Sequence, residues 1–168
     1  NLGLLSEITR GIEKEGLRVT PNGKLATTPH PSGLGSALTH PHITTDFAEP
    51  LLEFITSPST SVDDVFTQLD QLHRLTYQYL DDELLWVDSM PCQLGNDQDI
   101  PVARYGDSNI GRMKSIYRVG LGHRYGRSMQ TIAGVHYNFS MSDNFWRWLQ
   151  QTEAPDTDLQ SFKTERYF

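Results

Sequence analysis

The sequence is poor in cysteine and in long apolar runs. Cys92 is the single cysteine among 168 residues, so no internal disulfide can form, and the oxidising compartments that favour disulfides have no support. There is no apolar run of about 18 residues, and no leader in which a charged segment precedes an apolar one. We therefore expect no membrane partner and a cytoplasmic location, with Cys92 a buried small apolar residue.

Positive charge is also scarce. Lys and Arg number 14 against 21 Asp and Glu, which gives a net charge of −7 and a pI near 5.2. The basic residues are dispersed along the chain, whereas binding to a phosphate backbone requires them to be clustered on one face. Nucleic acid is therefore not an expected partner.

The length of the chain is enough for one substantial core. A single domain is the default for 168 residues. The chain opens on Asn1 rather than on methionine, and the segment 159–168 carries no stop signal. We therefore expect residues 1–168 to be one domain that forms the N-terminal part of something longer.

The most informative stretch is 11–19, GIEKEGLRV. Side chains alternate between the two faces of a strand, so Glu13 and Glu15 share one face if this stretch is extended. Glutamate is depleted in strands, and two carboxylates at this spacing repel unless a cation lies between them. A divalent metal such as Mg²⁺, which prefers oxygen ligands, would relieve the repulsion. The alternative is an edge strand with two solvated glutamates.

A second acidic stretch covers residues 44–56. Its composition predicts a strand over 51–56 with Glu53 between two apolar residues. Burying a carboxylate there costs several kcal/mol unless the group is paired, protonated or bound to metal. The alternatives are that this strand has one wet face, and that Asp46 and Glu49 are turn residues.

A third stretch, 131–141, alternates between a polar and an apolar face. His136 and Asn138 belong to the polar face, and Gly134 on the same face leaves room for a ligand or another backbone to approach. A hydrogen-bonded structural histidine is the alternative for His136. The other face is expected to be a core face and comprises Thr131, Ala133, Val135, Tyr137, Phe139 and Met141.

Two helices are predicted between these stretches. Ser61 has the spacing to Asp64 of a capping box and precedes an apolar stripe that runs to residue 80, including Phe66. His73 is expected on the surface of that helix. Residues 108–121 form the second predicted helix, with one apolar side expected to face the core: Met113, Ile116, Tyr117 and Leu121.

Several of these stretches resemble a proteobacterial-type glutamate–cysteine ligase in wording, order and spacing. They are GIEKEGLRV, LGSALTHPHITTDFAEPLLEFIT, SMPC, SNIGRMKSIYRVGL with RYG behind it, and MQTIAGVHYNFS, from about residue 8 to residue 146. The resemblance implies an α+β fold similar to glutamine synthetase, with a curved, mostly antiparallel sheet and packed helices. It also implies the activity: joining the γ-carboxylate of glutamate to the amine of cysteine with ATP, through γ-glutamyl phosphate, in the first step of glutathione synthesis.

The resemblance also implies site residues and a cofactor. Mg²⁺, or Mn²⁺ in its place, bridges phosphates in such enzymes. Tyr117 falls on a position that lines the cysteine pocket, which overrides its assignment to the core, and Asn138 is placed near substrate by its face. The family's metal and glutamate positions fall on Glu13, Glu15, Asp46, Glu53 and His136.

The family's chains are much longer, and their later part supplies further acidic ligands and arginines. We therefore expect this chain to be the N-terminal portion of a catalytic domain, to carry half a site, to bind metal weakly and to be inactive alone.

Other functions remain open at this stage. A related carboxylate–amine ligase with another acceptor would share the metal end of the site. A non-catalytic, metal-stabilised interaction domain would use the same acids to hold a structural ion. A hydrolase built on His136 is disfavoured, since neither an H-E-x-x-H motif nor a Ser or Cys nucleophile signature accompanies it.

Overall fold

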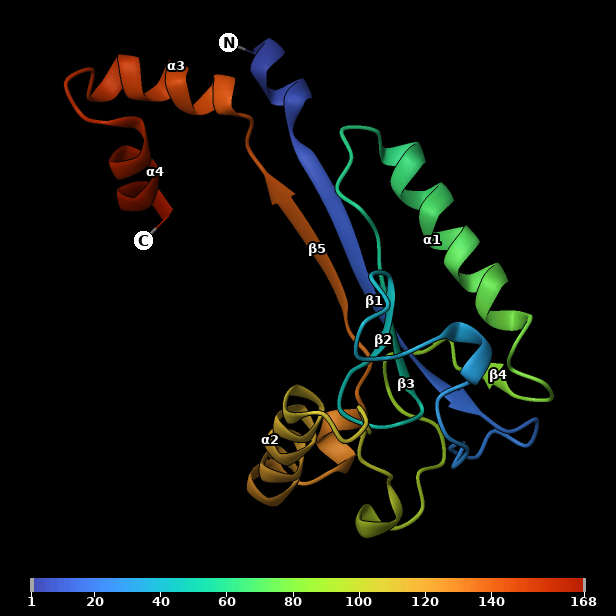
Figure 1. Cartoon of the computed structure of the whole chain (residues 1–168). Helices are drawn as coiled ribbons and strands as arrows, with labels where there is room; N and C mark the ends of the chain where they lie inside the picture. The colour runs from blue at the N-terminus through green and yellow to red at the C-terminus, as the bar shows by residue number, and fades with distance from the viewer. Residues whose placement is uncertain (1, 168) are drawn as a thin grey trace.

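A computed structural model describes residues 2–167 and shows an antiparallel sheet with helices around it (Figure 1). The strands are β1 (Thr9–Val19), β2 (Ile43–Thr45), β3 (Leu51–Ile55), β4 (Leu84–Leu85) and β5 (Val135–Ser140). The helices are α1 (Val62–Tyr77), α2 (Asn109–Tyr125), α3 (Asp143–Glu153) and α4 (Leu159–Tyr167). Short 3₁₀ turns span Leu2–Glu7, Ser32–Leu34, Asp97–Asp99 and Ser128–Thr131. The α+β prediction is confirmed.

The long strand β1 is the centre of the sheet. Four of the five strands run in the order β2-β3-β1-β4, and the fifth, β5, pairs with the N-terminal half of β1. All of the strand pairs are antiparallel. The three stretches that the sequence marked as informative therefore lie side by side, in β1, β3 and β5.

Two apolar clusters cover opposite faces at the C-terminal end of β1. Leu17 pairs with Leu51, and both belong to a cluster that includes Phe47 and Ile100. Residues of the other face, among them Phe54, pack beneath the apolar stripe of α1. Alternation along β1 and β3 then places Glu13, Glu15 and Glu53 on the Leu17 face, away from α1.

Helix α1 begins as predicted, because the Ser61 side chain accepts a hydrogen bond from the backbone N–H of Asp64. One expectation along it is wrong, because Phe66 is 59% exposed and is not part of the core. His73 is half-buried, with its ring centroid 4.5 Å from that of Phe54. Leu69, Leu72 and Leu75 are the residues of α1 that pack on the apolar cluster, and Phe66 lies outside it.

The predicted core sides of α2 and β5 are largely exposed. On α2, Met113, Ile116 and Tyr117 are each more than 60% exposed. On β5, Val135, Tyr137 and Phe139 are also exposed by more than 60%, although Thr131 and Ala133 before it are buried. The reason is placement, because β5 lies at an edge of the sheet and no element of residues 2–167 covers that face.

The last two helices lie away from the sheet (Figure 1). Ser142 caps α3, its side chain accepting a hydrogen bond from the backbone N–H of Phe145, and α3 packs with α4 and with the N-terminal turn Leu2–Glu7. Among the helices described, none is both long enough and apolar enough to span a bilayer. Cys92 is buried, as expected.

Candidate functional site

Strand register gathers acidic side chains from distant parts of the sequence on one face of the sheet. Glu15 pairs with Glu53 across β1 and β3, and Glu13 pairs with His136 across β1 and β5. Directly opposed residues have Cβ atoms about 5 Å apart, so the two glutamates of the first pair repel each other at neutral pH. We call Glu13, Glu15, Asp46 and Glu53 the carboxylate cluster.

Glu53 carries the clearest electrostatic signature of the cluster. Burial, followed by the negative charges of Asp46, Glu15 and Glu13, raises the pKa of Glu53 to about 6. The positive charge of Arg118 opposes this shift. Asp46 joins the cluster from the turn between β2 and β3, where its backbone N–H donates to the Leu51 carbonyl at 3.0 Å. A carboxylate in such surroundings favours either a proton or a cation.

Glu15 is held in place by β5 and the residues before it. The Gly134 N–H donates to Glu15 Oε2 at 2.7 Å, and His136 Nε2 lies 3.8 Å from Glu15 Oε1. Burial raises the pKa of Glu15, while the Gly134 hydrogen bond lowers it; Asp46 and Glu13 raise it and His136 lowers it. The predicted close approach at Gly134 is therefore one of backbone to carboxylate. There is little room for a side chain at this position, because a Cβ would lie 3.1 Å from His136 Nε2.

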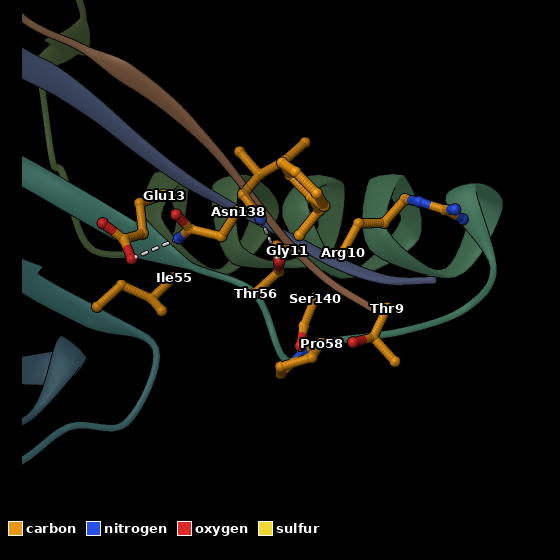
Figure 2. A pocket seen from close by; sticks show the side chains of 11 residues that line it. Thr9, Arg10, Gly11, Glu13, Ile55, Thr56, Pro58, Asn138 and Ser140 are labelled. Carbon is orange, nitrogen blue, oxygen red and sulfur yellow. Dashed lines mark hydrogen bonds between the residues drawn. The ribbon is translucent and has the colours of Figure 1, made fainter. Parts of the chain in front are cut away.

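Asn138 orients Glu13. Its Nδ2 donates to Glu13 Oε1 at 2.8 Å, a contact visible in Figure 2. Because an amide donates without adding charge, it fixes one carboxylate oxygen and leaves the other free to bind a ligand.

A groove continues from this contact along the same face of the sheet. It encloses about 310 Å³, near the lower limit of volumes typical of small-molecule sites. In Figure 2 the Glu13–Asn138 contact lies at one end and Thr9 and Pro58 at the other. Gly11 contributes no side chain to the floor, and a Cβ there would meet Thr56 Oγ1 at 3.5 Å. The lining residues are Thr9, Arg10, Gly11, Ile12, Glu13, Ile55, Thr56, Pro58, Asn138, Phe139 and Ser140.

The cluster fits a divalent cation by its chemistry rather than by a closed coordination shell. Carboxylate oxygens are the ligands that Mg²⁺ prefers, and burial together with the repulsion between them raises the pKa of Glu53. Within residues 2–167, however, no three His, Cys, Asp or Glu side chains come together as a ready-made metal site. The metal assignment for Glu13, Glu15, Asp46, Glu53 and His136 therefore stays a prediction.

The other acidic candidate, Glu49, does not belong to the cluster. Its side chain is buried, and its carboxylate accepts hydrogen bonds from the backbone N–H groups of His30 at 2.9 Å and Arg104 at 2.7 Å. Glu49 is therefore a structural residue that ties two loops together.

Two neighbouring residues of α2, Tyr117 and Arg118, bear on the site, and only the first was identified from the sequence. Tyr117 is 64% exposed and does not lie in the core, as the resemblance had already argued. Arg118, which the sequence analysis did not single out, donates through Nε to the backbone carbonyl of Asp46. Its position next to Tyr117 was the available signal, but helical periodicity does not show which arginine turns inward.

The open antiparallel sheet, with a row of carboxylates on one face, has the fold of the glutamine-synthetase-like ligases. The comparisons give the family. Residues 1–168 match the family described as glutamate-cysteine ligase, and the chain belongs to that family.

The relatives include two glutamate–cysteine ligases. The chain is 62% identical to that of Alcanivorax borkumensis over 164 residues, covering 98% of this chain and 31% of the relative. It is 61% identical to that of Saccharophagus degradans over 168 residues, covering 100% of this chain and 32% of the relative. The chain thus spans about a third of the length of these relatives.

Two solved structures share the fold. The glutamate–cysteine ligase of Francisella tularensis, in complex with AMP, has a TM-score of 0.85 and 46% identity, over 90% of this chain and 30% of that one. A bifunctional glutathione synthetase from Pasteurella multocida has a TM-score of 0.86 and 35% identity, over 99% of this chain and 22% of that one.

Proposed function

We propose that residues 1–168 supply the carboxylate half of the active site of a cytoplasmic, ATP-dependent ligase that joins glutamate to cysteine. The observation that carries the proposal is the carboxylate cluster, in which Glu15 faces Glu53 beside Asp46 on one sheet face. Family membership, and the AMP-bound relative from Francisella tularensis, support ATP as the co-substrate.

The proposed reaction has two steps, phosphoryl transfer to glutamate and attack by the cysteine amine. A γ-carboxylate oxygen of glutamate attacks the γ-phosphorus of ATP, the bond from that phosphorus to the bridging oxygen breaks, and ADP leaves. The cysteine amine then attacks the carbonyl carbon of γ-glutamyl phosphate, phosphate leaves, and the amine proton passes to phosphate or water. Neither step requires a protein nucleophile, so the chain contributes position and charge.

The cluster residues would hold Mg²⁺ or Mn²⁺, with His136 as a nitrogen ligand beside Glu15. When bound, the cation neutralises the charge of the transferring phosphate. Asn138 orients Glu13, and the Gly134 N–H orients Glu15, so each carboxylate keeps one direction before substrates arrive. The free-energy cost of orienting these carboxylates is met when the chain folds, so it does not add to the barrier of the reaction.

The groove that begins at Glu13 is the proposed site of the base and sugar of the nucleotide. Ile55 and Pro58 supply apolar side chains to its lining. We assign it to the base and sugar of ATP, because phosphates held at the cluster leave the rest of the molecule next to Glu13. Tyr117 on α2 is assigned to the cysteine side.

The test is ADP release, coupled to a second enzyme, with glutamate, cysteine and Mg-ATP. The complete chain to which residues 1–168 belong is expected to be active, and residues 1–168 alone are expected to be inactive. Turnover by residues 1–168 alone refutes the half-site claim. An inactive complete chain, or one that prefers another amine, rejects cysteine ligation.

A structural ion is the second candidate, since the same cluster would hold one. In that case Glu13→Gln and Glu53→Gln lose much thermal stability once Mg²⁺ is removed. A catalytic ion leaves both variants as stable as the parent or more so, because one of the repelling charges is gone.

A further inference from the structure

Helix α2 has little apolar attachment to the rest of the molecule. Gly111 is its one buried residue in the described structure, and the apolar side chains of Ile110, Met113 and Ile116 are exposed. Apolar packing holds only its C-terminal part, where half-buried Leu121 lies against the cluster that contains Leu17 and Phe47. Further contacts must hold the part of the helix that carries Tyr117.

Arg118 supplies a polar attachment. Its guanidinium donates through Nε to the carbonyl oxygen of Asp46 and through Nη1 to that of Lys114 at 3.2 Å. The guanidinium carbon lies 4.7 Å from the ring centroid of Tyr105, in a cation–π contact. Arg118 is half-buried, so these contacts are partly shielded from water.

Tyr105 also binds the backbone at Thr45 and Asp46. It is 5% exposed, and its hydroxyl donates a hydrogen bond to the Thr45 carbonyl at 2.6 Å or to the Asp46 carbonyl at 3.0 Å. The Asp46 carbonyl thus faces two donors, one on α2 and one in the loop before it. Arg118, Tyr105 and Asp46 form a unit that we call the Asp46 clamp.

The Asp46 clamp holds the backbone of a residue whose carboxylate belongs to the carboxylate cluster. The Asp46 carboxylate acts electrostatically on both Glu15 and Glu53, whereas its backbone is what the clamp holds. Residues that orient a ligand from behind typically change metal affinity by about 10–100-fold when they are removed. Tyr117 directly precedes Arg118 on α2, so one contact sets both the position of Asp46 and that of the helix that carries Tyr117.

We propose that Arg118 is a positioning residue that fixes Asp46 in the carboxylate cluster and docks helix α2, with Tyr117, against it. This inference rests on the proposed function, which supplies the role of the cluster. The proposal predicts that replacing Arg118, which contacts neither metal nor cysteine, changes both the Mg²⁺ dependence of the activity and the KM for cysteine.

The test compares Arg118→Met with Arg118→Lys in the complete chain. Arg112→Met is the matched control, because Arg112 lies exposed on the same helix and its guanidinium has no hydrogen bond within residues 2–167. Arg118→Met is expected to raise the Mg²⁺ concentration for half-maximal activity about tenfold, and to raise the KM for cysteine more than that for ATP. Arg118→Lys, which keeps one donor, is expected to fall between, and Arg112→Met to match the parent.

Hydrogen exchange gives a second readout that does not depend on activity. Amides of α2 and of Asp46 are expected to exchange faster in Arg118→Met than in Arg112→Met, while those of β1 and β3 are unchanged. Unchanged Mg²⁺ dependence together with unchanged exchange overturns the proposal. Slower turnover with unaltered Mg²⁺ and cysteine dependence also overturns it.

Two further outcomes are informative. If the parent lacks ligase activity, the proposed function fails, and hydrogen exchange still decides whether Arg118 docks α2. If Arg118→Met does not fold, Arg118→Lys decides the question, and wild-type Mg²⁺ and cysteine dependence in it counts against the proposal.

Discussion

Glu15 and Glu53 stand directly opposite each other across β1 and β3, on the face of the sheet that α1 leaves uncovered. Like charges in this arrangement destabilise a sheet. Both pKa values are raised, that of Glu53 to about 6. The pair therefore costs stability at neutral pH unless a cation or a proton is bound, and the first two predictions follow from this cost.

The first prediction concerns pH. The folded pKa of Glu53, about 6, lies above its ordinary value of 4.5, so folding favours the protonated form. The destabilisation is absent below pH 4.5, grows as pH rises through 6 and is complete above it. Glu53→Gln is expected to increase the free energy of unfolding by about 1 kcal/mol at pH 7.5 and to leave it nearly unchanged at pH 4, after allowance for partial solvent screening.

Urea unfolding of residues 1–168 at the two pH values measures this difference. Glu165→Gln on α4 is the control, because Glu165 is exposed and far along the chain from the cluster. A Glu53→Gln variant that is less stable than the parent at pH 7.5 contradicts the prediction.

The second prediction concerns metal. Mg²⁺ is expected to raise the melting temperature of residues 1–168, by an amount equivalent to about 1.4 kcal/mol at ten times the dissociation constant. Glu15→Gln and Glu53→Gln are each expected to shrink the shift, while Glu165→Gln keeps it. Differential scanning calorimetry with and without MgCl₂ provides the measurement, and equal shifts in all four proteins would remove the cluster as the metal site.

The third prediction concerns the space at Gly134. A Cβ at this position would lie 3.1 Å from His136 Nε2 and 3.6 Å from Glu15 Oε2. Gly134→Ala is therefore expected to push the imidazole away from Glu15 and to lower the free energy of unfolding by about 1 kcal/mol. The NMR chemical shifts of the His136 ring should report its changed position.

Gly120→Ala on α2 is the matched control for Gly134→Ala. A Cβ at Gly120 meets nothing within 4 Å, and alanine is the better helix former by about 1 kcal/mol. The two substitutions should thus change stability in opposite directions, and a stabilising Gly134→Ala would show that the site there is looser than described.

The fourth prediction concerns the groove in Figure 2. A Cβ at Gly11 makes only an ordinary contact with Thr56 Oγ1, at 3.5 Å, so Gly11→Val should fold while its side chain occupies the floor of the groove. In the complete chain the KM for ATP is expected to rise about tenfold, with the KM for glutamate unchanged, because a filled groove excludes the base and sugar. Steady-state kinetics decide this, and an unaltered KM for ATP would move the nucleotide elsewhere.

Much of the local structure was predictable from the sequence. The alternation of Glu13 and Glu15 along β1 and the cap at Ser61 follow from short-range rules of strand periodicity and hydrogen bonding. The shared face of His136 and Asn138 follows from the same period of two. These features involve neighbours within a few residues, so no knowledge of distant segments was needed.

The errors concerned what covers a face. An apolar stripe on α2 and an alternating pattern on β5 show which residues lie together, but not whether another element packs on them. Tyr137 and Phe139 are exposed because no element within residues 2–167 packs on that face of β5, and Phe66 lies outside the cluster that α1 covers. Coverage depends on long-range packing, which a periodicity does not contain.

By itself the sequence determined that acids and one histidine lie on strands at positions where apolar residues would pack better, because side-chain direction along a strand is a local property. The tertiary structure alone decided that Glu15 meets Glu53, that Glu49 lies outside the cluster, and that Arg118 reaches the Asp46 carbonyl. The physical reason is that register and helix docking join residues dozens of positions apart, and their geometry is set by the packing of the whole chain.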